Sequence, residues 1–189
     1  SEAELIDELG FDRARVGVVE PGIDARYSPG GSRSDTPLVV AVGRLAPVKR
    51  FPMLIRAAAR ARERIGDLQL VIVGEGYTRP DVVATIDEVG GHDWVRLAGH
   101  VSDDELIGLY RSAWCVASAS EREGWGMTLT EAAACGTPAV VTNIAGHSDA
   151  TRDELSGSPS FGKKGLSNGP GRRPGAGRKA ALRKHPEGV

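Results

Sequence analysis

The chain has 189 residues, of which 40% are hydrophobic, and its formal net charge is −1. A length of this order fits a single domain, and a body of roughly 150 residues buries about 70% of its unfolded surface, so no disulfide is needed to hold a core. Because no run of about eighteen apolar residues and no charged-then-apolar leader occurs, we expect neither a membrane span nor a signal peptide.

Short apolar runs alternate with helical patterns along most of the chain. The runs predict strands at residues 16–19, 38–42, 68–73, 95–97, 114–117 and 139–141, and the patterns between them predict helices at 51–65, 79–89, 103–112 and 129–135. Continuously apolar strands are typical of parallel sheets that are covered on both faces. The sequence therefore predicts an α/β fold, a Rossmann-like doubly wound parallel sheet, in one domain over residues 1–157.

The two cysteines fit the same interpretation. Cys115 and Cys135 each lie in an apolar or alanine-rich run, and neither has the spacing of a metal ligand. Small buried thiols are the simplest explanation. We therefore expect no metal site and a reducing cytoplasmic location.

The strand at 38–42 leads into a loop that carries two cations, GRLAPVK at residues 43–49. Arg44 and Lys49 follow the strand end at Gly43. Arginine offers a planar fork of donors and lysine a mobile point charge, so the pair could neutralise a diphosphate, each charge-assisted bond contributing roughly 1.5–3 kcal/mol. An ordinary solvated basic loop is the alternative. The position favours a ligand, because open parallel sheets bind ligands outside the carboxyl ends of their strands.

The next strand ends in VIVGEG at residues 71–76. Gly74 and Gly76 begin like a dinucleotide fingerprint, but Arg79 occupies the third glycine position, so an NAD site is not expected. The loop at Lys49 likewise lacks the pattern of a P-loop. The two glycines indicate either a tight turn at a ligand cleft or an ordinary strand-to-helix turn.

The segment EGWGMTLTE at residues 123–131 sets two carboxylates, Glu123 and Glu131, around a glycine-rich turn. Gly124 and Gly126 permit positive φ angles and a close approach to a ligand. The alanine-rich helix that follows presents unpaired N–H groups and the positive end of its dipole. These features favour an anion, and the segment reads as a site for a phosphorylated sugar.

The same segment has a purely structural alternative. Thr128 and Glu131 match a capping box, in which both side chains would satisfy the first turn of the helix. The same pattern recurs at Ser102 and Glu105, where no ligand is expected.

The composition changes at the end of the chain. Residues 152–189 carry nine Lys or Arg against three Asp or Glu, a balance of +6 that leaves −7 for residues 1–151. Residues 157–177 contain seven glycines and three prolines without apolar periodicity. Such a segment cannot bury enough surface to offset the cost of ordering, so we expect residues 158–189 to form a disordered tail.

The segments GRLAPVK and EGWGMTLTEAAACGTPAVV, in this order and about eighty residues apart, resemble the donor-binding half of a retaining glycosyltransferase of the two-Rossmann GT-B type, the large group called glycosyl transferases group 1. Shorter matches at 19–24, 71–76, 96–101 and 143–147 support the resemblance, which covers roughly residues 15–157. It implies a single GT-B half-domain of a hexosyltransferase-type enzyme. The donor substrate would be a nucleotide-diphosphate sugar, and no further cofactor is implied.

The resemblance also implies roles for individual residues. Arg44 and Lys49 would bind the diphosphate. Glu131 would accept hydrogen bonds from the ribose hydroxyls, and Glu123 would lie near the donor sugar. The catalytic residues would then be Arg44, Lys49 and Glu123. Backbone groups of the glycine-rich turn would contact sugar and phosphate, and the backbone near Val101 would hold the base. The expected donor-binding residues are Gly43, Arg44, Lys49, Gly74, Val101, Glu123, Gly124, Gly126, Met127, Thr128 and Glu131.

A full enzyme of this type has a separate amino-terminal Rossmann domain that binds the acceptor, and residues 1–11 correspond to the segment that enters the second domain. We therefore expect the chain to be inactive by itself, because its cleft has only one wall. A metal is not demanded, since cations already face the leaving diphosphate.

Two other functions compete with this interpretation. One is a non-catalytic binding module whose basic tail contacts an anionic partner. Because the tail lacks interleaved aromatics and helical spacing, we expect no specific binding of nucleic acid. The other is a phosphorylase-like enzyme of the same general fold, for which the sequence lacks a cofactor-lysine context.

Overall fold

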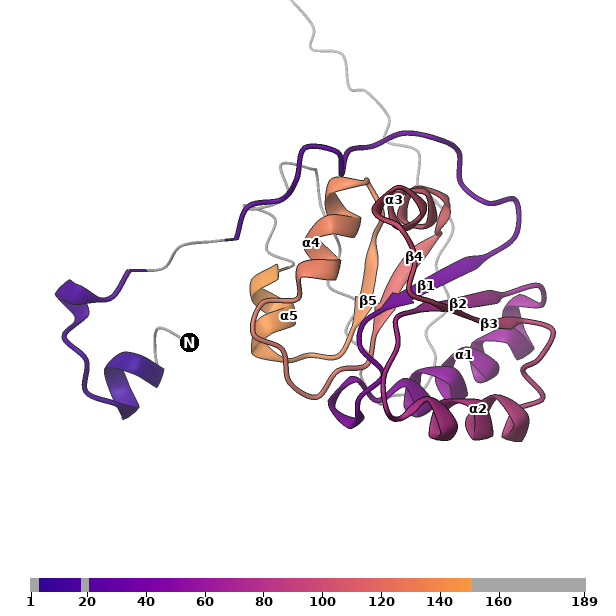
Figure 1. Cartoon of the computed structure of the whole chain (residues 1–189), viewed down its shortest axis with the longest axis horizontal. Helices are drawn as coiled ribbons and strands as arrows, with labels where there is room; N and C mark the ends of the chain where they lie inside the picture. Colours follow the sequence, from indigo (N-terminus) through magenta and orange to yellow (C-terminus); the bar gives the residue numbers. More distant parts are fainter. Residues whose placement is uncertain (1–3, 18–20, 151–189) are drawn as a thin grey trace, which may run out of the picture.

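The computed structural model describes residues 4–17 and 21–150. Within them a parallel sheet of five strands forms the centre of the molecule: β1 (Leu38–Val42), β2 (Gln69–Val73), β3 (Val95–Gly99), β4 (Cys115–Ser118) and β5 (Ala139–Val141). The strands pair in the order β3-β2-β1-β4-β5 (Figure 1). The chain moves outward from β1 to β3 and then crosses back to add β4 on the other side of β1. The topological switch point of the sheet thus lies between β1 and β4.

Helices cover both faces of this sheet, as a doubly wound fold requires. The helices are α1 (Phe51–Ile65), α2 (Arg79–Glu88), α3 (Asp103–Ser112), α4 (Met127–Ala134) and α5 (Ala145–Ala150), and shorter helical turns occur at Glu4–Glu8, Arg13–Arg15 and Pro47–Lys49. Figure 1 shows α1 and α2 on one side of the sheet and α3 and α4 on the other. The α/β fold with a Rossmann-like parallel sheet is confirmed.

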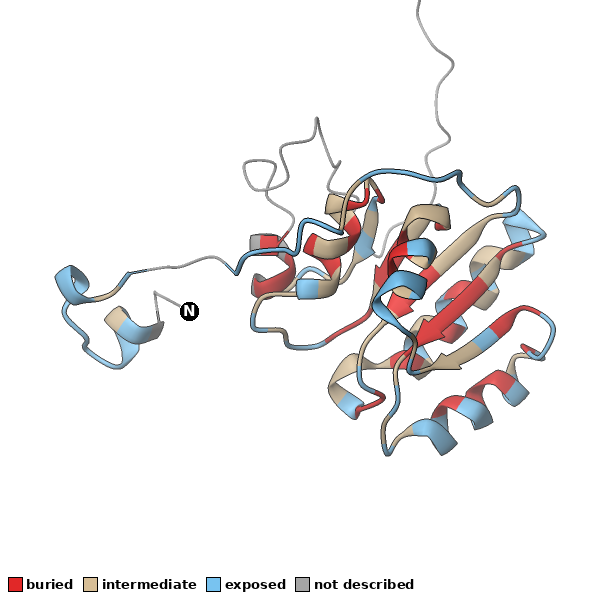
Figure 2. Cartoon of the chain, turned by 45° about the horizontal axis from the view of Figure 1, so that its top comes forward, coloured by how far each residue is buried: buried red, intermediate tan, exposed pale blue. Residues whose placement is uncertain are grey.

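The central strand β1 serves both faces of the sheet because its sequence, LVVAV, is apolar at every position. In β1, Val40 packs into the cluster under α3 and α4, whereas the next residue, Ala41, packs under α1 and α2. Successive side chains of a strand point to opposite faces, so a continuous apolar run serves two cores at once. Figure 2 shows the buried strands between exposed helix surfaces.

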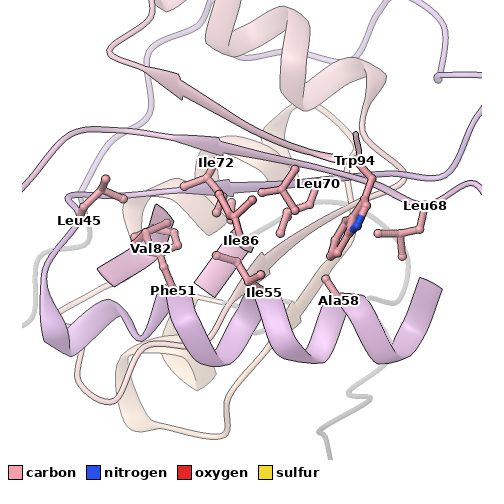
Figure 3. Close-up of a cluster of buried hydrophobic side chains, with 12 residues drawn as sticks. Leu45, Phe51, Ile55, Ala58, Leu68, Leu70, Ile72, Val82, Ile86 and Trp94 are labelled. Carbon is pink, nitrogen blue, oxygen red and sulfur yellow. The ribbon is translucent and has the colours of Figure 1, made fainter. Parts of the chain in front are cut away.

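The cluster between the sheet and the helices α1 and α2 is shown in Figure 3. Phe51, Ile55 and Ala58 of α1 recur at helical spacing and face the sheet. The members of this cluster are Ala41, Leu45, Phe51, Ile55, Ala58, Leu68, Leu70, Ile72, Val82, Ile86, Trp94 and Val95. On the other face the cluster consists of Val40, Val71, Val73, Ile107, Tyr110, Ala113, Val116, Leu129, Ala132, Cys135 and Ala150.

An irregular segment before β1 is fastened to the side of the domain formed by α3. The guanidinium of Arg33 donates to the carbonyl oxygens of Ala113 and Gly136. In the opposite direction, Nε of Arg111 donates to the carbonyl oxygen of Ser28 at 2.8 Å. These contacts hold α3 at a fixed place beside α4.

The predicted strand at 16–19 is wrong for residues 16 and 17. The turn Arg13–Arg15, whose amide at Ala14 is capped by the Asp12 side chain at 3.0 Å, ends at Val16, and neither Val16 nor Gly17 pairs with the sheet. Residues 18 and 19 lie outside the described residues, as do 151–157 and the predicted tail at 158–189.

The two cysteines are free thiols. Cys135 is buried as expected, whereas Cys115 is only half-buried at the start of β4. Burial raises the pKa of both thiols above the ordinary value.

Candidate functional site

An ion pair lies at the topological switch point of the sheet. Lys49 comes from the loop that follows β1, and Glu123 from the loop that follows β4, and β1 and β4 are neighbours in the sheet. Nζ of Lys49 is 2.5 Å from Oε1 of Glu123. Their side chains are only 22% and 15% exposed. Two residues separated by 74 positions are therefore joined at the edge where parallel sheets bind ligands.

The carboxylate of Glu123 has a second donor, because Oγ of Ser120 donates to Oε1 at 2.6 Å. Burial by itself would raise the pKa of Glu123, but the hydrogen bonds from Lys49 and Ser120 outweigh it and hold this pKa below the ordinary value. Glu123 is therefore ionised at neutral pH. Lys49 is the single lysine among residues 1–162, so the site holds the one ammonium side chain of the domain.

The two loops that carry this pair are bound to each other through their backbones. The amide of Glu121 donates to the carbonyl oxygen of Val48 at 2.9 Å. The guanidinium of Arg50 donates to the carbonyl oxygens of Ala119 at 2.7 Å and Ser120 at 3.4 Å. Arg50 has φ = 49°, and it is the one non-glycine residue with positive φ among residues 4–17 and 21–150. Its contacts offset the strain of that conformation, which is of order 1–2 kcal/mol.

The helix after Glu123 begins earlier than predicted. Gly126 is its N-cap, with φ = 82°, and the first helical residue is Met127 rather than Leu129. Thr128 is thus inside the helix, and the capping box of Thr128 and Glu131 is wrong, because the left-handed glycine fixes the start of the helix. The amides of the first turn, at Met127 and Thr128 among others, have no carbonyl partner within the helix.

The serine half of the second capping box is confirmed. Ser102 is the N-cap of α3, and its Oγ accepts a hydrogen bond from the amide of Glu105 at 3.3 Å.

Glu131 has a different partner from the one expected of a capping residue. The hydroxyl of Tyr110, on α3, donates to Oε2 of Glu131 at 2.9 Å. Burial is the main reason that the pKa of Glu131 is raised, and the nearby charge of Asp103 adds to it, while the hydrogen bond from Tyr110 opposes the shift. The two carboxylates of the segment 123–131 therefore lie in different surroundings, one against the β1 loop and one against α3.

The remaining predicted residues occupy several environments. Arg44 is exposed, and its side chain makes no hydrogen bond or ion pair with the part of the chain that the structure describes. Gly124 is also exposed. Val101 is half-buried, and its side chain packs against the cluster under α3 and α4. Gly43 lies directly against Lys49, since a Cβ atom there would be 3.2 Å from Cε of that side chain.

Gly74 has a structural reason to be glycine. A Cβ atom on Gly74 would overlap the carbonyl oxygen of Gly43, and one on Gly76 would overlap that of Leu45. The amide of Gly43 donates to Val73, and the amide of Leu45 to Glu75, each at 2.9 Å. The turn after β2 thus packs backbone against backbone on the loop that carries the cations, which is the ordinary function of a strand-to-helix turn and also positions that loop.

Residues outside the predicted set of site residues complete the site. Oγ of Ser118 lies 3.1 Å from Oγ of Ser120 and 3.1 Å from Nε2 of His147, which is 1% exposed. Side chains two positions apart at a strand end share one face of the sheet. The spacing of Ser118 and Ser120 could therefore have predicted that their hydroxyls lie together. Tyr110 and Arg50 gave no such signal, because their partners lie 21 and 69 positions away.

Two further properties bear on the kind of site. Among residues 4–17 and 21–150, no group of three or more His, Cys, Asp or Glu side chains is arranged to hold a metal ion. Within the same residues, no helix has the length and hydropathy needed to cross a membrane.

Comparison with known proteins identifies the family. The family model described as glycosyl transferases group 1 matches residues 26–159. A D-inositol 3-phosphate glycosyltransferase of Salinispora tropica is 38% identical over 179 residues, which cover 82% of this chain and 37% of that protein. The counterpart in Mycolicibacterium smegmatis is 34% identical over 169 residues and is matched over 38% of its length. The chain therefore spans about two fifths of the length of these relatives.

The solved structures agree on the fold. Staphylococcus aureus TarM, crystallised with UDP among other ligands, has a TM-score of 0.69 at 24% identity, over 79% of this chain and 30% of that one. It is a likeness of fold alone. The matched segments include both loops of the Lys49–Glu123 pair and the helix α4, and these lie where the sheet reverses its strand order. The chain belongs to the glycosyl transferases group 1 family, with the Rossmann-like domain of a GT-B glycosyltransferase.

Proposed function

We propose that this chain is the donor-binding domain of a glycosyltransferase and binds a nucleotide-diphosphate sugar at the switch point between β1 and β4. The observation that carries the proposal is the contact of Lys49 with Glu123, which lies three residues before Gly126, the N-cap of α4. A half-buried ammonium, glycine-rich backbone and a helix N-terminus are all suited to phosphate oxygens. UDP in the crystal structure of the related fold of TarM is consistent with this ligand class.

The roles of the residues follow from the charge of the leaving group. As the bond from the sugar to the diphosphate breaks, negative charge develops on the diphosphate, and cations and N–H dipoles fixed in advance stabilise it. Lys49 and Arg44 provide the cations, and the backbone from Gly124 to Thr128 provides the dipoles. Glu123 lies at the sugar, Glu131 at the ribose, and the backbone of Gly43, Gly74 and Val101 borders the nucleotide. These positive groups make a metal at the diphosphate unnecessary.

The ion pair of Lys49 and Glu123 has a consequence for binding. Lys49 is already neutralised by Glu123, so an entering diphosphate has to exchange one anionic partner of the ammonium for another. Arg44 is exposed and needs no such exchange. We infer that Arg44 makes the first contact with the diphosphate and that Lys49 turns toward it afterwards.

We further propose that a separate amino-terminal Rossmann domain binds the acceptor and that this chain by itself does not transfer sugar. We also propose that the transfer retains the anomeric configuration and takes place in the cytoplasm. The relatives are named for D-inositol 3-phosphate, which makes a phosphorylated polyol a candidate acceptor for the full-length protein.

Calorimetry tests the donor site. UDP, GDP, ADP and their glucose conjugates are titrated into the full 189-residue chain and into Arg44→Ala and Lys49→Ala variants. We expect each substitution to weaken diphosphate binding by about 10- to 100-fold, the equivalent of one charge-assisted hydrogen bond, and to leave nucleoside binding nearly unchanged. Arg64→Ala is the matched control, since Arg64 is an exposed arginine in the last turn of α1.

Two results would contradict the proposal. Equal losses of affinity for nucleoside and nucleoside diphosphate would remove the phosphate role of Arg44 and Lys49. A folded wild-type chain that binds none of the nucleotides at millimolar concentration would remove the donor site as a whole.

A further inference from the structure

Tyr110 is a buried tyrosine whose hydroxyl faces a residue of the donor site from another helix. It lies on α3, has 0% of its surface exposed, and donates to Oε2 of Glu131 on α4 at 2.9 Å. The nucleotide-binding roles proposed above do not include it. Its partner Glu131 is half-buried.

The position of Tyr110 is fixed from several directions. Its ring packs against the ring of Tyr27, with centroids 6.2 Å apart and an angle of 51° between the planes. Its carbonyl oxygen accepts a hydrogen bond from Oγ1 of Thr137 at 2.5 Å. The packed ring and the fixed backbone together place the hydroxyl beside Glu131.

Glu131 accepts hydrogen bonds best as an ionised carboxylate. Its half-buried place and the neighbouring charge of Asp103 both raise the pKa of Glu131, whereas the hydrogen bond from Tyr110 favours the ionised form. Burial and the adjacent carboxylate raise the pKa of Tyr110 well above its ordinary value, so its hydroxyl remains a donor at every physiological pH. The contact uses Oε2 of Glu131, and Oε1 is not part of it.

We propose that Tyr110 is the positioning residue for Glu131 and that it determines the preference of the site for a ribose diol over a deoxygenated sugar. The inference rests on the proposed function, because it assumes that Glu131 accepts hydrogen bonds from the ribose. A carboxylate fixed in one rotamer meets two adjacent hydroxyls at the geometry that both bonds require. A carboxyl group that rotates freely or is protonated accepts these two hydrogen bonds less well.

The test compares two ligands of the same charge. The diphosphate with whichever base the wild-type chain binds most tightly, of uracil, guanine and adenine, is titrated beside its 2′,3′-dideoxy analogue. The preference for ribose is the dissociation constant of the dideoxy analogue divided by that of the diphosphate with an intact ribose. In Tyr110→Phe we expect this ratio to fall by about tenfold, which corresponds to one hydrogen bond to a charged group. The affinity for the dideoxy analogue should stay unchanged, since that ligand has no diol to discriminate.

Tyr27→Phe is the matched control, because it removes a hydroxyl from the neighbouring ring that has no hydrogen bond to Glu131 among the described residues. Glu131→Ala should abolish the preference, and adding Tyr110→Phe to it should change nothing more. Glu131→Gln keeps an oxygen that can accept from Tyr110 and should retain part of the preference. Thermal melts establish that each variant is folded.

The outcomes separate the inference from the function on which it rests. If Tyr110→Phe weakens both ligands equally, or leaves the ratio at the wild-type value, Tyr110 is only a core residue and the inference is overturned. If the wild-type chain binds the diphosphate and its dideoxy analogue equally well, the ribose role of Glu131 fails together with this inference, while the phosphate site stands. Absence of any nucleotide binding overturns both.

Discussion

The ion pair of Lys49 and Glu123 should contribute measurably to stability. Exposed pairs contribute about 0.2–1 kcal/mol, whereas breaking a fully buried pair costs about 3–5 kcal/mol. With side chains 22% and 15% exposed, this pair lies between the two cases. Replacing Lys49 with Met leaves Glu123 with only the Ser120 hydroxyl as a donor, and we expect a loss of about 2 kcal/mol in the free energy of unfolding.

The assay is urea denaturation followed by circular dichroism, for wild type, Lys49→Met, Glu123→Gln and the double variant. For a domain of this size a loss of about 2 kcal/mol corresponds to a decrease of roughly 4–8 °C in the melting temperature. The double-mutant cycle should give a coupling energy of about 1.5 kcal/mol for the two side chains. Glu123→Gln keeps an acceptor for Lys49 and Ser120, so the cycle reports the part of the interaction that depends on charge.

The same pair gives a pH dependence with a definite sign. The folded-state pKa of Glu123 lies below the ordinary value of 4.5, so the unfolded chain takes up the proton first as the pH falls. The stability difference between wild type and Lys49→Met is therefore fully present above this unfolded value and is lost as the pH falls through the folded-state pKa. A coupling energy below about 0.5 kcal/mol at pH 7, or a difference that grows on acidification, would refute the reasoning.

The loops around the pair support two further predictions, both measured as free energies of unfolding in urea. Arg50→Ala should lower the free energy of unfolding by about 1 kcal/mol more than Arg50→Gly, because both remove the guanidinium but only glycine tolerates φ = 49° without strain. Equal losses would show that the backbone at this position relaxes in the alanine variant. Gly126→Ala should destabilise the domain by about 1–2 kcal/mol, since φ is 82° and the new Cβ atom would lie 3.3 Å from Leu129. Gly124→Ala, which has open space around it, is the control and should stay within about 0.5 kcal/mol of wild type.

The positions of most helices and strands follow from local patterns in the sequence. The helix predicted at 51–65 has those bounds in the structure, because Phe51, Ile55 and Ala58 recur at the helical period and bury one stripe. The strands were recognisable because an apolar run bounded by glycine and proline has few other stable conformations in a covered sheet. The two loops of the candidate site were predicted from cations and glycines that follow the ends of strands.

The tertiary structure decided what no local pattern contains, namely which side chains meet. Lys49 and Glu123 are adjacent only because the chain crosses back to place β4 beside β1, and the sequence of either loop is compatible with other strand orders. The local sequence of Glu131 fits a capping residue, but the left-handed Gly126 places the start of the helix two residues earlier than that role requires. The packing of α3 beside α4 gives its carboxylate a different partner, Tyr110. Hydrogen-bond partners at this distance in the chain depend on crossovers and helix placement, and these are set by the burial of the whole sheet.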